Sequence, residues 1–361
     1  MGHRRASGHL VVLIKKCFLK IALLLALTSC QLAYLAESSY YQADLLRKRV
    51  PLKYALKHYN LSPQQRERIE MTIQLREFME NKLKLKTNSN FSRYVELDQP
   101  YVTYVVSAAP KNELKQHIWH FPIIGTVPYK GFFKKEKAVQ EVKKLEAQDL
   151  DTNLRGVSAY STLGWFEDPL LSSMLNMKEH QFISTLIHET VHANLYIKGH
   201  SKFNERVASF LGRLGAETYY KNKNKIRELV EILEKESHDE LIFSRFISSE
   251  IKELKEWYQN HQSNPNLLAL RQKRFQAITQ KFKETIAPQL QTDSYKNFSD
   301  RELNNASLLL MGLYMSDFSE FEIVANHHHR DFQKVFTELK KLEDKENPEK
   351  ALSQLVAKLT N

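Results

Sequence analysis

Cysteine is almost absent from this sequence: its 361 residues include only two, Cys17 and Cys30. Both lie close to the N-terminus, so the rest of the chain can form no disulfide and offers no thiolate to a metal. Any metal site there must be built from histidine and carboxylate side chains. Glycine and proline number only 10 each, which disfavours a loop-rich all-β fold. The composition therefore favours a largely helical protein.

No basic stripe interleaved with aromatic residues is present, although the formal net charge is +11. Five of these positive charges fall within the first 29 residues, which contain no acid, and the rest are spread through segments rich in Lys and Glu. This distribution gives no support to a nucleic-acid partner. Hydrophobic residues at 42% and charged residues at 26% are typical of a soluble globular protein.

The N-terminal apolar run, at residues 21–27, is too short for an ordinary membrane span. A basic stretch precedes it, which is the pattern of a secretory signal. Residues 27–30, Leu-Thr-Ser-Cys, resemble the bacterial lipobox. The resemblance implies that residues 1–29 are a signal peptide and that Cys30 is lipidated, which would anchor the protein in the cell envelope. Because Gln31 follows, it also implies the outer membrane of a Gram-negative bacterium; a plain signal peptide or a short anchor is the alternative.

The remaining residues, 30–361, are expected to form one α+β domain that is mostly helical. Its predicted parts are a helical N-terminal part at 37–95, a small sheet with the following helices at 100–220, and a helical C-terminal part at 221–361. β-Branched and aromatic runs predict strands, and periodic apolar residues predict helices. The expected strands are 101–106, 117–127 and 156–166, and the expected helices include 134–147, most of 180–285 and 303–314.

Residues 188–192 read His-Glu-x-x-His. On a helix, residues four apart lie one turn apart on the same face, so His188 and His192 can bind one ion. Glu189 lies about 100° round the helix from His188. Its carboxylate is therefore beside the ion, where it can take a proton from an attacking water molecule. These three residues predict the core of a zinc-hydrolase site.

The flanking residues predict how far this helix extends and how deeply it is buried. Leu186, Ile187 and Val191 make it largely apolar, and titratable groups on a buried helix need an explanation. A pair of solvated surface histidines is the alternative. Residues 180–198 contain no Gly or Pro, so the helix is expected to continue as far as Gly199.

A third metal ligand is expected after this helix. The metzincin pattern is excluded, because positions 195 and 198 lack the Gly and His that it requires. Glu205 is the better candidate, since a turn at 199–203 and an antiparallel helix would bring its carboxylate near the ion, with Gly212 allowing close packing. His200 is a competitor, and Glu205 could instead be a surface acid. A His/His/Glu set suits zinc best among the divalent ions.

The stretch Asn-Glu-x-x-Ala at 204–208 resembles the gluzincins. More closely, the chain resembles a bacterial lipoprotein family named predicted aminopeptidase, over nearly all of its length after the signal. The resemblance implies a zinc metallopeptidase that removes N-terminal residues from peptides. It rests on residues 128–133 (Pro-Tyr-Lys-Gly-Phe-Phe), 159–166 (Ala-Tyr-Ser-Thr-Leu-Gly-Trp-Phe), the 188–205 block and 304–306 (Asn-Asn-Ala).

Substrate contacts are expected along the strand at 156–166, because zincins pair the substrate backbone with an edge strand beside the active-site helix. An aminopeptidase must also bind a free α-ammonium group. Glu167 or Asp168 is the candidate, although Asp168 could equally begin a turn. Tyr160 and Tyr314 are candidate donors to the oxyanion, although either could be a core aromatic residue.

Three functions stay open from the sequence. The first is an aminopeptidase with a peptide substrate, and the second is an endopeptidase of the cell envelope. The third is a zinc-stabilised binding lipoprotein without catalysis, in which the metal would have no open coordination position. The oligomeric state is not predicted.

Overall fold

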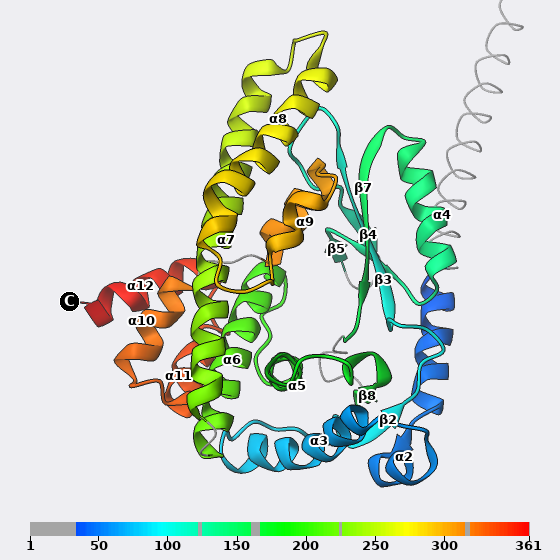
Figure 1. Ribbon diagram of the computed structural model, residues 1–361, viewed down its shortest axis with the longest axis vertical. Coiled ribbons are helices and arrows are strands. Elements are labelled where there is room, and N and C mark those ends of the chain that lie inside the picture. The colour runs from blue at the N-terminus through cyan, green and yellow to red at the C-terminus, as the bar shows by residue number, and fades with distance from the viewer. Residues whose placement is uncertain (1–33, 122–124, 160–166, 224–225, 315–317, 361) are drawn as a thin grey trace, which may run out of the picture. The chain divides into compact units, whose positions relative to one another are not determined.

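The computed structural model (Figure 1) describes residues 34–121, 125–159, 167–223, 226–314 and 318–360. The expected signal peptide and Cys30 lie outside these residues. The chain divides into two compact units, one of residues 1–48 and 120–126 and the other of residues 49–119 and 127–361. In the described residues, no helix combines the length and the apolar character that crossing a membrane requires.

The fold is α+β and mostly helical, as predicted. In the smaller unit, residues 34–47 are helical, and the ring of Tyr34 lies 5.3 Å from that of Phe121. The short strands β4 (Trp119–Phe121) and β5 (Gly125–Val127) pair with each other. The larger unit contains the helices α2 (Leu52–His58), α3 (Pro63–Asn81), α4 (Lys135–Glu146), α5 (Glu179–His192), α6 (Ser201–Asn222), α7 (Ile226–His261), α8 (Leu267–Lys281), α9 (Asn305–Tyr314), α10 (Ser319–His327), α11 (Phe332–Lys340) and α12 (Pro348–Thr360).

Two three-stranded sheets belong to the larger unit. In the first, β2 (Arg93–Val95) lies between β1 (Val50–Pro51) and β8 (Leu170–Leu171). In the second, β3 (Thr103–Pro110) lies between β6 (Lys130–Phe132) and β7 (Leu150–Val157), and both neighbours are antiparallel to it. Because side chains alternate along a strand, the second sheet presents two different faces.

One face of the second sheet packs on α4. Tyr104, Val106 and Ala108 project from β3 into a small core that includes Ala138 and Leu145 of the helix. The opposite face contacts α9 through β3 and β7, so that α4 and α9 lie on opposite sides of the sheet (Figure 1). The remainder of this second face carries Thr103 and Val105, which line a cavity described below.

The strand predicted at 156–166 overlaps the observed strand β7 (Leu150–Val157) only at residues 156 and 157. β7 pairs with the full length of β3. Residues 158 and 159 are not in a strand, and residues 160–166 lie outside the described part of the chain. Residues 150–155 read Leu-Asp-Thr-Asn-Leu-Arg, a run with low strand propensity. Pairing with β3 and packing on α4 outweigh that propensity here.

Helix starts and stops follow the sequence more closely. Ser62 caps α3: its hydroxyl accepts from the backbone N–H of Gln65, whose side chain accepts in return from the backbone N–H of Ser62. This reciprocal capping box satisfies two N–H groups that the helix itself cannot bond. The predicted helical region at 220–285 contains α7 and α8, which share an aromatic core with the residues after them, built on Phe243, Phe246, Phe282 and Phe298.

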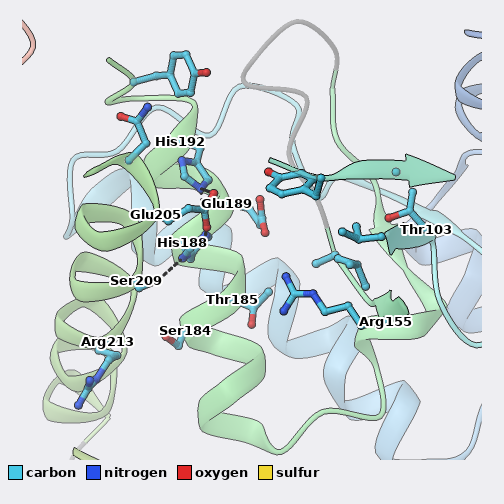
Figure 2. Close-up of a pocket in the computed structure, with 17 residues that line it drawn as sticks. Thr103, Arg155, Ser184, Thr185, His188, Glu189, His192, Glu205, Ser209 and Arg213 are labelled. Carbon is cyan, nitrogen blue, oxygen red and sulfur yellow. Dashed lines mark hydrogen bonds and ion pairs between the residues drawn. The ribbon is translucent and has the colours of Figure 1, made fainter. Parts of the chain in front are cut away.

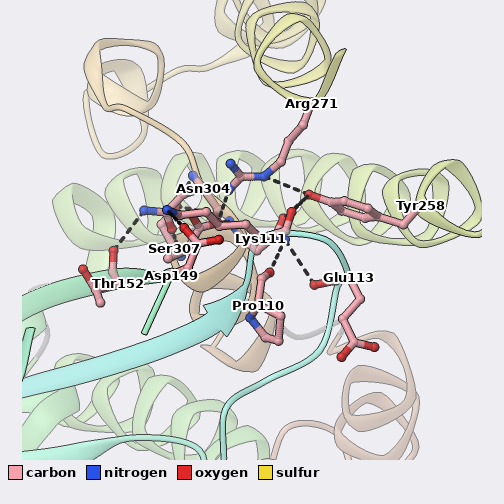
Figure 3. A network of polar contacts seen from close by, with 11 residues as sticks. Pro110, Lys111, Glu113, Asp149, Thr152, Tyr258, Arg271, Asn304 and Ser307 are labelled. Atoms are coloured by element: carbon pink, nitrogen blue, oxygen red, sulfur yellow. Dashed lines mark hydrogen bonds and ion pairs between the residues drawn. The ribbon is translucent and has the colours of Figure 1, made fainter. Parts of the chain in front are cut away.

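A buried polar network ties α8 and α9 to the paired strands β3 and β7 (Figure 3). The guanidinium of Arg271 pairs with the carboxylate of Asp151 and donates to the hydroxyl of Tyr258 at 2.9 Å. Asn305 donates its backbone N–H to Asp151 at 2.9 Å and its side-chain amide to the Pro110 carbonyl at 2.8 Å. All of these polar groups are satisfied by one another, so the network holds the sheet in place beside the helices.

Loss of the Asp151 carboxylate should destabilise the fold strongly. Asp151→Asn leaves the Arg271 guanidinium buried without a counter-charge, which is expected to lower the free energy of unfolding by about 3 kcal/mol or more. Urea unfolding followed by circular dichroism at pH 7 measures the change. Asp149→Asn is the matched control: its exposed carboxylate pairs with Lys111, and the expected loss is below about 1 kcal/mol. Equal losses in the two variants would contradict the role given to the network.

Candidate metal centre

The His-Glu-x-x-His residues lie in the last two turns of α5. His188 and His192 stand one turn apart, and their Nε2 atoms lie 3.0 Å from each other. The two rings are nearly perpendicular, at 85°. Glu189 is buried beside them, with only 9% of its surface exposed. The side chains of all three gather at one end of a cavity (Figure 2), so the helix predicted for this motif is present.

The helix ends earlier than predicted: α5 stops at His192, not at Gly199. Asn194 accounts for the early end, because its amide donates to the Thr190 carbonyl at 2.8 Å, a carbonyl at the end of the helix. The same side chain bonds both backbone groups of Lys86, at 2.9 and 3.0 Å. The chain then turns away through residues 193–200, where Gly199 has a φ of +83°, a conformation that glycine adopts without strain.

Asn204 closes this turn from within the next helix. Its side chain is 1% exposed, accepts from the Ile197 N–H at 2.9 Å and donates to the Ile197 carbonyl at 2.8 Å. The first bond satisfies a backbone N–H that the turn would otherwise bury unpaired, and the second adds to the bond that the Ile197 carbonyl accepts from the N–H of His200. They also define where α6 starts relative to the end of α5, and so where the neighbouring Glu205 side chain lies.

Glu205 reaches both imidazoles, as the antiparallel arrangement predicts. One of its carboxylate oxygens lies 3.7 Å from Nε2 of His188, and the other lies 3.6 Å from Nε2 of His192. His200, the competing ligand, stands at the N-cap of α6 and does not line the cavity. The structure therefore brings together His188, His192 and Glu205, with Glu189 beside them.

The close approach of α5 and α6 depends on glycine. A Cβ atom on Gly212 would lie 2.8 Å from the carbonyl oxygen of Ser184 and 3.2 Å from Cβ of His188. A Cβ on Gly215, one turn further along, would lie 2.9 Å from a methyl carbon of Ile187. Side chains at these positions would separate the helices, and Glu205 would move away from the histidines with α6. The packing role predicted for Gly212 is confirmed.

Burial controls the protonation of the four side chains. It lowers the pKa of His188 well below its ordinary value, helped by the charge of His192, and it lowers the pKa of His192 to about 4. Burial also raises the pKa of Glu189 to about 8, with Glu205 and Asp168 adding to the rise. The pKa of Glu205 rises to about 7 for the same reason, opposed by the positive charge of Arg155. Without a cation the centre thus favours neutral groups.

A divalent cation fits this donor set. Neutral imidazole nitrogens and a carboxylate oxygen are ligands that zinc prefers, and its bonds of about 2.0–2.1 Å place the donors of a tetrahedral site about 3.3 Å apart. The three observed separations, 3.0, 3.6 and 3.7 Å, lie close to that spacing. Among the described residues, His188, Glu189 and His192 have donor atoms close enough together to hold a metal. Glu205 has an oxygen within 3.7 Å of each imidazole, so it fits the third ligand position and leaves Glu189 beside the ion.

A hydrogen-bonding contact from outside the ligand set orients the imidazole of His188. The hydroxyl of Ser209, on α6, lies 3.4 Å from Nδ1 of His188, on the far side of the ring from the other ligands. Such contacts hold a ligand ring in place and select its tautomer. The Nδ1 atom of His192 is buried and has no hydrogen-bond partner among the described residues.

The centre opens onto a cavity of about 640 Å³, a volume within the usual range for a small-molecule site. Its walls are α5, α6 and the sheet face opposite α4. Polar groups dominate near the metal ligands, and Val105 and Val157 supply apolar surface. The lining residues outside the metal centre are Thr103, Val105, Tyr129, Gly131, Arg155, Val157, Ala159, Ser184, Thr185, Tyr196, Asn204, Ser209 and Arg213.

The structure does not place the remaining predicted site residues among the metal ligands. Glu167 is exposed and faces Arg49, whose guanidinium donates to its backbone carbonyl at 3.0 Å; it does not line the cavity. Asp168 is 4% exposed and lies close enough to Glu189 to raise the pKa of that group. Tyr160 lies outside the described residues. Tyr314 ends α9, and its side chain is not among those described.

Several cavity residues were not predicted from the sequence. Tyr129 belongs to the quoted Pro-Tyr-Lys-Gly-Phe-Phe stretch, to which no role had been given, and Arg155 precedes the strand that had been expected. Strand alternation provides a signal for Arg155, because it lies two residues before Val157 on the same face of β7. Asn204 stands next to Glu205 in the Asn-Glu-x-x-Ala stretch, yet its bonds to the turn depend on an early helix end that the sequence pattern did not indicate.

Comparison with known proteins gives one family. A family model described as "Putative aminopeptidase" matches residues 33–353. No curated protein and no solved structure matches the chain. The matched range includes the metal centre, the cavity and the helices from α7 to α11.

Replacement of Asn204 should weaken the metal centre without touching a ligand. Asn204→Ala leaves the buried N–H of Ile197 without its acceptor, and an unpaired buried group of this kind costs about 1–3 kcal/mol of folding free energy. The Ile197 carbonyl loses one of its two donors and keeps the N–H of His200. Because Glu205 shifts with the start of α6, zinc affinity is expected to fall by about 10- to 100-fold. Competition with a chromogenic chelator measures it. Asn204→Asp, which can still accept from Ile197, should give an intermediate loss. A folded Asn204→Ala protein with wild-type zinc affinity would disprove the positioning role.

Proposed function

The chain belongs to the family described as "Putative aminopeptidase", and from this premise we propose that it is a zinc-dependent peptidase that removes N-terminal residues from peptides. The observation that carries the proposal is the position of Glu189, a buried carboxylate that lines the cavity beside two imidazoles and a second carboxylate. A purely structural metal site has no need of a carboxylate there, whereas hydrolysis requires a base within reach of both water and substrate.

Three side chains of the centre would hold zinc: His188, His192 and Glu205. When bound, the ion supplies Lewis-acid polarisation of the scissile carbonyl and makes water more acidic. The histidines are suited to this because burial keeps them neutral. Glu205 adds one negative charge, and its arrangement after the His-Glu-x-x-His helix is the gluzincin-like one.

Glu189 acts as the proton carrier. Its carboxylate takes a proton from the attacking water as the water oxygen bonds to the carbonyl carbon. The protonated carboxyl then gives this proton to the amide nitrogen, the C–N bond breaks, and a carboxylic acid and an amine leave.

A tyrosine of the cavity can supply the donor to the oxyanion. Tyr129, in the bend before β6, and Tyr196 both line the cavity, and the phenol of either can donate to the oxygen that gains charge. Of the two predicted partners for the substrate ammonium, Asp168 is buried near Glu189 and Glu167 faces Arg49. Neither lines the described cavity, so the ammonium partner stays a prediction. The oxyanion role predicted for Tyr160 and Tyr314 stays a prediction.

We also propose that the protein acts in the cell envelope as one domain over residues 30–361. The signal-like residues 1–29 and the lipobox-like sequence that ends at Cys30 support a lipid anchor. A peptidase held in this way would act on peptides at the membrane surface.

Replacement of Glu189 tests the mechanism. Glu189→Gln keeps the shape of the side chain but cannot accept the proton, so kcat for a peptide such as trileucine should fall by about 10²- to 10⁴-fold. Zinc content, measured by atomic absorption, should stay at the wild-type level. Glu205→Gln is the comparison, because a change to a ligand should reduce zinc content itself. Turnover that persists in Glu189→Gln at the wild-type rate would disprove the role of Glu189 as the proton carrier.

The same assay separates the alternatives. N-acetylated trileucine lacks the free ammonium group, so an aminopeptidase should leave it intact. Cleavage of the acetylated peptide would indicate an envelope endopeptidase. Stoichiometric zinc without hydrolysis of any peptide would indicate the non-catalytic binding lipoprotein.

A further inference from the structure

A cationic side chain lies across the cavity from the metal centre. Arg155 stands on β7 opposite Val105 of β3 and lines the cavity together with Thr103 and Val157. Figure 2 shows its guanidinium directed from the sheet toward α5, on the side where Glu189 and Thr185 project. It therefore faces the space that a substrate bound at the metal centre would occupy.

The charges around this space are unevenly distributed. Among the described residues that line the cavity, the acids are Glu189 and Glu205, and both belong to the metal centre. Arg213 also lines the cavity, but its guanidinium pairs with Glu240 and Ser237 of α7. Residues 160–166, the segment after Ala159, contain no charged amino acid. The wall opposite the metal thus presents a guanidinium and, among its described residues, no carboxylate.

Arg155 lies in the same cavity as the metal centre: the guanidinium and the carboxylates of Glu189 and Glu205 line it together. A dication would balance the charges of Glu189 and Glu205, which lie on the side of the metal centre. The wall opposite keeps the positive charge of Arg155, so this wall would attract an anionic group.

A guanidinium is well suited to one particular anion. Its planar fork of N–H donors binds a carboxylate with two parallel hydrogen bonds, and five donors allow it to keep other contacts at the same time. Peptides carry carboxylates at the C-terminus and on acidic side chains. A cavity of about 640 Å³ has room for a short peptide, so a C-terminal carboxylate and a scissile bond can lie in it together.

We propose that Arg155 binds a carboxylate of the substrate and that the substrates are accordingly short peptides with a free C-terminus. The inference rests on the proposed peptidase function and narrows it. The metal centre acts at one end of the peptide, and Arg155 recognises the carboxylate beyond the scissile bond. A long polypeptide, whose C-terminal carboxylate lies far from the scissile bond, would lose this contact.

A binding experiment tests the assignment independently of turnover. The probe is trileucine with a methyleneamine in place of its first peptide bond, which cannot be cleaved there. It is prepared as the free acid, as the C-terminal amide, and as the amide with Glu at its third position. Isothermal titration of the zinc-loaded full-length chain should show the acid binding about 10- to 100-fold more tightly than the leucine amide, since hydrogen bonds to a charged group contribute about 1.5–3 kcal/mol.

Variants of Arg155 should remove this preference. Arg155→Gln should weaken binding of the acid to the level of the amide, and it should change binding of the amide by less than about twofold. Arg155→Lys keeps the positive charge but lacks the planar pair of N–H donors, so it should retain part of the preference for the acid. Arg93→Gln removes an exposed cation of β2 and should match the wild type. Circular dichroism and zinc content establish that each variant is folded and loaded.

The outcomes separate the possible failures. Equal binding of acid and amide by the wild type, an equal loss of both in Arg155→Gln, or no binding of any probe would overturn the assignment. Tight binding of the glutamate amide, lost in Arg155→Gln, would assign the contact to an acidic side chain and overturn the requirement for a free C-terminus. Acid-selective binding through Arg155 in a protein that hydrolyses no peptide would refute the proposed function and leave the carboxylate site standing.

Discussion

The distance between α5 and α6 is the constraint on which the candidate centre depends. Two ligands come from one helix and the third from its neighbour, so the donor atoms can converge only if the helix axes are close. Gly212 and Gly215 leave room for this approach, since a Cβ at either position would meet atoms of α5 within 3 Å. Asn204 fixes the start of α6, and the helix packing fixes its separation from α5. Together they place Glu205.

Local pattern was enough to predict the helical core of the site but not its boundaries. His188, Glu189 and His192 follow from helical spacing, and the antiparallel return to Glu205 follows from a short connection after the helix. The end of α5 at His192 was missed. The Asn194 side chain that bonds the Thr190 carbonyl there is also bound to both backbone groups of Lys86, which is far from it in the sequence. No spacing rule within residues 186–205 contains that information.

The sheet was harder to predict for a related reason. β7 contains an aspartate, an asparagine and an arginine, and its stability as a strand comes from β3 and from the network around Asp151, not from its own propensity. The Asn304-Asn305-Ala306 stretch, which looked family-like but had no assigned role, proves to be part of that network. Its polar side chains bond backbone groups of β3 and β7, so they act on the cavity only through the position of the sheet.

The early end of α5 has a consequence for how the molecule assembles. The two histidines, Glu189 and Glu205 all fall within residues 188–205, and their positions depend on one helix–turn–helix segment. The wall that carries Arg155 comes from strands much further away in the sequence, which must pair before they can face the metal centre. Local contacts form faster than distant ones, so the ligand set can assemble ahead of the wall. The two halves of the cavity can therefore change separately during evolution, with one chemistry retained behind different recognition surfaces.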